Sequence, residues 1–210
     1  MGARRWPMRA TILRGFLFAP LLWLASPALA QAPAAAQEPE VLLPPDAPMG
    51  GWGGPTVEFG EVNGQAGLFV GGRGGWLIAR RFTIGGAGMG LVTPVDGPRA
   101  VLAPRDLKVA YGGLWLETTF QPLELLHVTA GLIAGGGGAD LTPDGEDYAV
   151  KSDGFFVVEP SVCLELNVGR TVRADLGATY RLVGGFALEG LDGKDLSGPA
   201  LILVVKFGSF

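Results

Sequence analysis

Apolar and polar residues alternate one by one along the second half of this chain. In 171–182 the even positions are all apolar or aromatic, whereas the odd positions include Arg173, Asp175 and Arg181. Successive side chains of a β-strand point to opposite faces, so this stretch predicts a strand with one apolar and one charged face. A helix would mix the two kinds of residue around its axis, so the pattern restricts the fold strongly.

Eight runs of this kind lie between Thr56 and Phe210, separated by turn residues. Their approximate bounds are 56–62, 66–78, 82–92, 107–120, 125–135, 155–168, 171–182 and a last run around 201–207. Glycine accounts for 35 of the 210 residues, which disfavours a mostly helical chain because glycine costs about 1 kcal/mol relative to alanine inside a helix. We therefore expect an all-β fold. Pro160 removes a ladder hydrogen bond within its run, so a bulge or a misplaced strand is expected there.

The first thirty residues are predicted to be a secretory signal peptide. Four arginines precede an apolar stretch, Phe16 to Leu24, and 28–30 reads Ala-Leu-Ala. A charged start, a short apolar centre and an A-x-A end are typical of such leaders, and the apolar stretch is too short for a membrane anchor. Residues 31–54, rich in Pro, Ala and Gly, predict a flexible periplasmic tail, which leaves 55–210 as the folded domain.

The composition excludes several classes of function. Removing the leader takes away four arginines and leaves an acidic mature chain, which argues against nucleic acid as a partner. Cys163 is the only cysteine and His127 the only histidine, so an internal disulfide and a multi-thiolate metal site are excluded. We expect no metal site and no cofactor.

The lengths of the connections favour a barrel embedded in a bilayer. Those after the second, fourth and sixth runs are short, whereas those after the third, fifth and seventh, at about 94–106, 136–153 and 186–197, are long. Bacterial outer-membrane barrels have short periplasmic turns, longer outer loops and an even number of strands. Asn63-Gly64 is a tight hairpin signal where a long outer loop would be expected. We predict an eight-stranded antiparallel up-and-down transmembrane β-barrel with its apolar face toward lipid; a soluble periplasmic barrel is the alternative.

This arrangement assigns places to two groups of side chains. Aromatic residues near the predicted periplasmic ends would form an interfacial girdle: Trp76, Phe82, Phe120 and Phe207. Charged residues on the opposite face would line the lumen: Glu58, Arg73, Glu117, Glu159, Glu165, Arg173, Asp175, Arg181 and Lys206. Eight strands enclose an interior just wide enough for side chains, and buried charges must pair. We expect an ion-paired plug, with a narrow polar path as the alternative.

In this architecture the chain resembles the small eight-stranded outer-membrane barrels of the type formed by the membrane domain of outer-membrane protein A. The resemblance covers about 56–210, and Phe210 resembles the terminal aromatic residue that the barrel-assembly machinery reads in that class. Phe207 lies at a position of opposite parity from Phe210, so the terminal aromatic residue does not continue the alternation of the last strand. The resemblance implies an exported monomer in the outer membrane, in contact with outer-membrane lipid, lipopolysaccharide and the assembly machinery.

Candidate chemistry is sparse. His127, Ser161 and Glu159 lie on inward faces of neighbouring runs and are the one conceivable hydrolase grouping, but no G-x-S-x-G motif accompanies them. The acidic loop 140–153 offers weak divalent-cation bridging to lipopolysaccharide, although its spacing does not match a calcium loop. We predict a structural, adhesive or surface-interaction role without enzyme activity. A narrow pore or small-solute-binding barrel and a lipid-modifying enzyme are the alternatives.

Overall fold

The computed structural model describes residues 46–97, 105–143, 149 and 151–210. Eight long strands form its body: β1 (Met49–Val62), β2 (Gln65–Ile78), β3 (Phe82–Leu91), β4 (Arg105–Phe120), β5 (Leu126–Pro143), β6 (Lys151–Asn167), β7 (Val172–Gly184) and β10 (Gly198–Ser209). The connection between β7 and β10 holds a two-stranded hairpin, β8 (Ala187–Leu188) and β9 (Leu191–Asp192), and a one-turn helix, α1 (Gly193–Leu196). The all-β prediction is confirmed. The predicted signal peptide lies outside the described residues, and within them no helix is long and apolar enough to cross a bilayer.

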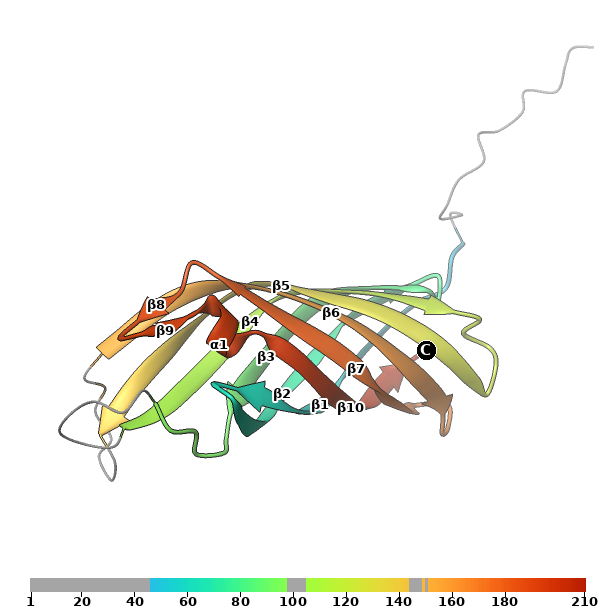
Figure 1. Ribbon diagram of the computed structural model, residues 1–210. Coiled ribbons are helices and arrows are strands. Elements are labelled where there is room, and N and C mark those ends of the chain that lie inside the picture. Colours follow the sequence, from blue (N-terminus) through green and yellow to red (C-terminus); the bar gives the residue numbers. More distant parts are fainter. Residues whose placement is uncertain (1–45, 98–104, 144–148, 150) are drawn as a thin grey trace, which may run out of the picture. The chain divides into compact units, whose positions relative to one another are not determined.

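The eight long strands close into a barrel in which every neighbouring pair is antiparallel (Figure 1). Following hydrogen-bonded partners around the barrel from Met49 leads back to β1 at Phe59, by way of Ile78, Phe82, Thr118, Ala130, Val162, Ala178 and Leu201. The stagger is therefore ten residues, and a stagger of this kind tilts the strands against the barrel axis. The predicted eight-stranded up-and-down barrel is confirmed.

The connections alternate in length as predicted, but one of them is bounded differently. Residues 79–81, 121–125 and 168–171 make the short turns at one end of the barrel. The predicted long loop 136–153 is wrong, because β5 continues to Pro143 and β6 begins at Lys151. At the other end Asn63 and Gly64 form a tight turn with φ of 50° and 69°, the left-handed geometry that an Asn-Gly hairpin favours.

Two further details differ from the sequence expectation. β1 begins at Met49 rather than near Thr56, because glycine has no side chain and shows no alternation. Pro160 causes no bulge: its pairing with Leu132 keeps the β5–β6 register, and the β6–β7 register is the same before and after it. The missing N–H interrupts the ladder with β7 without shifting it, and the Thr179 hydroxyl donates to the Pro160 carbonyl at 2.9 Å.

The outer surface of the barrel is apolar over most of its height. From the short-turn end up to Glu61, Lys108 and Asp140, the outward-facing residues of the strands are apolar, glycine or proline, apart from Thr118, Ser209 and the hydroxyl of Tyr180. About eleven residues of tilted strand cross a bilayer, and β1 presents such a length between Met49 and Phe59. The inverted arrangement, with the apolar face outside, is the one that a lipid environment stabilises.

The interior contains two different regions. Toward the short-turn end the inward side chains are mostly charged or hydroxyl-bearing. Toward the long-loop end they form an apolar cluster that includes the connection between β7 and β10: Val62, Phe69, Val95, Leu107, Val109, Leu141, Phe155, Val157, Phe186, Leu188, Leu191 and Leu196. The hairpin and α1 thus cover this end of the lumen with an apolar core.

We expect the inward Gly85 of β3 to be less replaceable than its outward neighbour Gly86. A Cβ at Gly85 would lie 2.0 Å from the Gly74 carbonyl oxygen, whereas a Cβ at Gly86 has its nearest neighbour at 3.8 Å. Gly85→Ala should destabilise the barrel by about 1–3 kcal/mol through overpacking, and Gly86→Ala should be nearly neutral. Urea unfolding in lipid vesicles, followed by gel mobility, measures both; equal effects of the two substitutions would contradict the argument.

Candidate functional site

All nine charged residues assigned to the lumen from the sequence lie inside the barrel. None is more than 7% exposed: Glu58, Arg73, Glu117, Glu159, Glu165, Arg173, Asp175, Arg181 and Lys206. Charged groups withdrawn from water in this way are stable only when hydrogen bonds and opposite charges replace the solvent. The contacts among them therefore decide what the interior can do.

Lys206 is the centre of the larger cluster. Its Nζ lies 2.8 Å from a Glu117 carboxylate oxygen and 2.9 Å from an Asp175 carboxylate oxygen, and it also pairs with Glu165. In the strand order, β10 and β4 stand on opposite sides of the barrel. The Lys206–Glu117 pair therefore crosses the lumen, and the ammonium group additionally lies 4.4 Å from the centre of the Trp52 ring.

Glu165 extends this cluster toward the short-turn end. One of its oxygens accepts from Arg173 Nη1 at 2.7 Å and lies 2.7 Å from His127 Nε2. The Arg173 guanidinium lies 4.1 Å from the centre of the Phe210 ring. Phe210 therefore faces the inner side of the wall, whereas Phe207 is exposed on the outer side. This explains why the terminal aromatic residue is out of step with the alternation before it.

A second cluster lies farther from the short turns. Arg73 Nη2 is 3.1 Å from a Glu58 carboxylate oxygen, and its guanidinium packs 4.4 Å from the centre of the Trp115 ring. The Tyr111 hydroxyl lies 2.6 Å from Glu159 and 3.1 Å from Glu58, so β4 is connected to both β6 and β1. The sequence analysis missed Tyr111. Its only signal was its inward position in a part of the run 107–120 where apolar and polar residues alternate irregularly.

Two of the nine residues have no ion pair with another described residue. Glu159 interacts with the Tyr111 hydroxyl. Arg181 donates from Nε to the Leu196 carbonyl at 2.7 Å and from Nη2 to the Glu61 carbonyl at 3.4 Å, and it packs 4.1 Å from the centre of the Phe69 ring. Arg181 thus connects α1 to the barrel wall, at the boundary between the charged region and the apolar cluster.

The aromatic residues expected in a girdle face outward near the short turns. Trp76, Phe120 and Phe207 are more than half exposed and Phe82 is half-buried. Three other outward aromatic side chains, Phe59, Phe156 and Tyr180, lie nearer the long-loop end. The sequence analysis did not assign these to a girdle, although their parity marked them as outward.

The structure does not bring the hydrolase grouping together. His127 Nδ1 lies 3.1 Å from the Glu124 carbonyl and Nε2 faces Glu165. In the described part of the chain no hydrogen bond joins His127 to Ser161 or Glu159. Of the acidic loop, Asp140 belongs to β5 and Asp153 to β6, where Asp153 accepts from the Ala187 amide at 2.8 Å. Its other carboxylates, at 144, 146 and 147, lie outside the described residues.

The fold is similar to solved outer-membrane barrels. Neisserial surface protein A matches with a TM-score of 0.53 and 14% identity, over 76% of this chain and 96% of that one. The attachment invasion locus protein Ail of Yersinia pestis (0.45, 14%, 76% and 97%) and the N-terminal β-barrel domain of OprF of Pseudomonas aeruginosa (0.47, 10%, 76% and 96%) also match. No family model and no curated protein matches the chain.

The match to Neisserial surface protein A, an outer-membrane β-barrel, is a match of fold, and this chain is a closed eight-stranded antiparallel barrel of that fold class. Identities this low concern the fold alone. They carry no ligand, partner or activity to this chain.

Replacing Lys206 should destabilise the barrel strongly. Lys206→Met leaves Glu117, Glu165 and Asp175 without their shared cation, and breaking a buried pair in this way costs about 3–5 kcal/mol. Lys194→Met, which removes an exposed lysine, should change stability by less than about 0.5 kcal/mol. Urea unfolding of refolded protein in vesicles gives both values, and similar stability of the two variants would refute the role assigned to Lys206.

Replacing Arg181 should loosen α1 while the barrel stays closed. Arg181→Met removes charged hydrogen bonds to backbone carbonyls, each contributing about 1.5–3 kcal/mol. Trypsin should then cleave after Lys194 at least about tenfold faster than in the unmodified protein. Arg170→Met, on an exposed turn, is the matched control, and unchanged cleavage at Lys194 in the Arg181 variant would show that α1 is held by other contacts.

Proposed function

We propose that this protein is an outer-membrane β-barrel that is closed to solutes and has a structural or surface-interaction role. The observation that supports this most directly is that the interior is obstructed twice. Lys206 and Glu117 pair across the charged region, and the apolar cluster fills the long-loop end. Eight strands leave only the space that side chains fill.

The proposed orientation places the turns 79–81, 121–125 and 168–171 in the periplasm. In outer-membrane barrels the periplasmic turns are short and the outer loops are long. The chain before β1 is then also periplasmic, which agrees with export by the predicted signal peptide. The predicted contacts with lipopolysaccharide and with the barrel-assembly machinery belong to this proposal.

The outer end of β4, β5 and β6 is the surface through which such a role would act. These strands have 16, 18 and 17 residues, several more than the 9–11 that cross a bilayer. Their inward residues at this end, including Leu107, Leu141 and Phe155, pack in the same apolar cluster as Leu188 and Leu196. In the described residues, this end therefore extends the barrel with a packed apolar core.

The mature protein should be silent in planar bilayers, because the ion pairs and the apolar cluster leave no continuous aqueous path. The measurement is conductance after insertion of protein whose barrel is shown to be folded by a heat-modifiable shift in gel mobility. A porin preparation that is known to conduct serves as the positive control. Ohmic steps from the folded protein would support the pore alternative, and recovery in the soluble fraction without detergent would refute membrane residence.

A further inference from the structure

The short-turn end of the barrel carries exposed arginines beside a groove in the lipid-facing wall. Arg80 and Arg81 occupy the turn between β2 and β3, and both are exposed. No ion pair connects either guanidinium to a carboxylate in the part of the chain that the structure describes. Two cations so close to the membrane boundary attract an anionic group, because each contributes about fivefold to the affinity for an anionic bilayer surface.

The turn that carries them is held in place. The Ala79 amide donates to the Pro48 carbonyl at 2.8 Å, and the Arg81 carbonyl accepts from the Thr119 amide at 2.7 Å. Ala79 and Arg80 have φ of 53° and 56°, a left-handed geometry that is costly for residues other than glycine and asparagine. The arginines are therefore presented from a defined backbone, next to a shallow cavity of about 400 Å³ whose lining includes both of them and Gln121. Glu124 is the one carboxylate in that lining.

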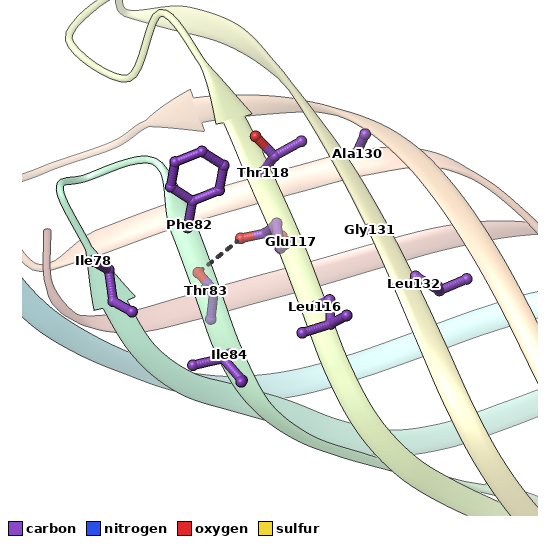
Figure 2. A pocket seen from close by; sticks show the side chains of 10 residues that line it. All are labelled: Ile78, Phe82, Thr83, Ile84, Leu116, Glu117, Thr118, Ala130, Gly131 and Leu132. Carbon is purple, nitrogen blue, oxygen red and sulfur yellow. Dashed lines mark hydrogen bonds between the residues drawn. The ribbon is translucent and has the colours of Figure 1, made fainter. Parts of the chain in front are cut away.

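An apolar groove begins directly beside this turn. Its volume is about 470 Å³, and Figure 2 shows its outward lining on β3, β4 and β5 with Ile78 at the end of β2. Ile78 and Phe82 flank the arginine turn in sequence and both line the groove. On β5 the groove is bordered by Ala130, which has only a methyl side chain, and by Gly131, which has none. Thr118 provides a hydroxyl among the apolar side chains. From the membrane boundary toward the bilayer interior, the surface thus presents first the two arginines of the turn, then the Thr118 hydroxyl, and then the apolar groove.

We propose that this surface is a binding site for one anionic phospholipid of the periplasmic leaflet. The headgroup phosphate contacts Arg80 and Arg81, and an acyl chain lies in the groove between Phe82, Leu116 and Leu132. The order of cation, hydroxyl and apolar surface matches the order of phosphate, glycerol ester and hydrocarbon in such a lipid. Exposed Trp76, at the β1–β2–β3 wall, marks the same depth as an interfacial anchor.

The test uses the mature chain refolded in phosphatidylcholine vesicles that contain increasing fractions of brominated phosphatidylglycerol or brominated phosphatidylcholine. Bromine quenches nearby tryptophan fluorescence, and Trp76 is exposed to lipid whereas Trp52 and Trp115 are buried in the interior. Trp76→Phe gives the background. We expect half-maximal quenching at an at least tenfold lower fraction of brominated phosphatidylglycerol than of brominated phosphatidylcholine.

Two variants separate the parts of the proposed site. Arg80→Gln with Arg81→Gln should abolish the preference, whereas Lys194→Gln, which removes an exposed cation at the other end of the barrel, should keep it. Ala130→Phe fills the groove with the arginines intact and should also abolish it. Equal quenching by both lipids in the unmodified protein, or an equal loss in the Lys194 variant, would overturn the proposal. A preference that survives Ala130→Phe but not the arginine changes would show that the arginines bind the headgroup without an acyl chain in the groove, and would overturn the lipid groove.

This inference depends on the proposed membrane residence, and the same experiment distinguishes the two. If neither brominated lipid quenches Trp76 and no heat-modifiable shift is seen, the barrel is not in the bilayer and the proposed function fails. If both lipids quench equally, the barrel is inserted and only the phospholipid site fails.

Discussion

Charge compensation around Lys206 is the interaction on which the rest of the barrel depends. Its three carboxylate partners come from β4, β6 and β7, and Glu117 on β4 is far in the sequence from Glu165 and Asp175. They surround one ammonium group only when the sheet is closed in the observed register. A slip of one residue would turn Lys206 to the outer face, where a lysine at the bilayer midplane costs about 2–4 kcal/mol. The cluster therefore selects the register as well as neutralising the interior.

The division of the interior follows from what surrounds each part. Within the apolar band a charged interior can be neutralised only by its own members, and Lys206, Arg173 and Glu165 do this. Beyond the band, the long ends of β4 to β6 are covered by residues such as Leu188 and Leu196, as in the core of a soluble domain. Arg181 lies where the two meet and donates to carbonyls of both α1 and β1. The charged region and the apolar cluster are therefore parts of one packing arrangement.

Local pattern predicted which residues face inward but not which residues meet. Arg173, Asp175 and Arg181 could be assigned to the interior because side-chain alternation needs only neighbours in sequence. The Lys206–Glu117 pair could not, because it depends on a stagger of ten residues accumulated around eight strands. The strand residues 136–138 were read as a loop since glycine carries no alternation, and Tyr111 was missed because an apolar neighbourhood concealed its role.

The interior has little space, and this explains why glycines in the barrel wall accompany large side chains in the lumen. A Cβ at Gly131 would lie 2.0 Å from Cη2 of Trp115, and one at Gly137 would lie 2.6 Å from the ring of Phe155. These two large inward side chains therefore fit because the neighbouring strand has no side chain at that point, and Trp115 in turn covers the Arg73 guanidinium. The aromatic cover of the Arg73 guanidinium therefore depends on the missing side chain at Gly131. The high glycine content, which in the sequence argues against a mostly helical fold, thus also leaves space for the charged side chains inside the barrel.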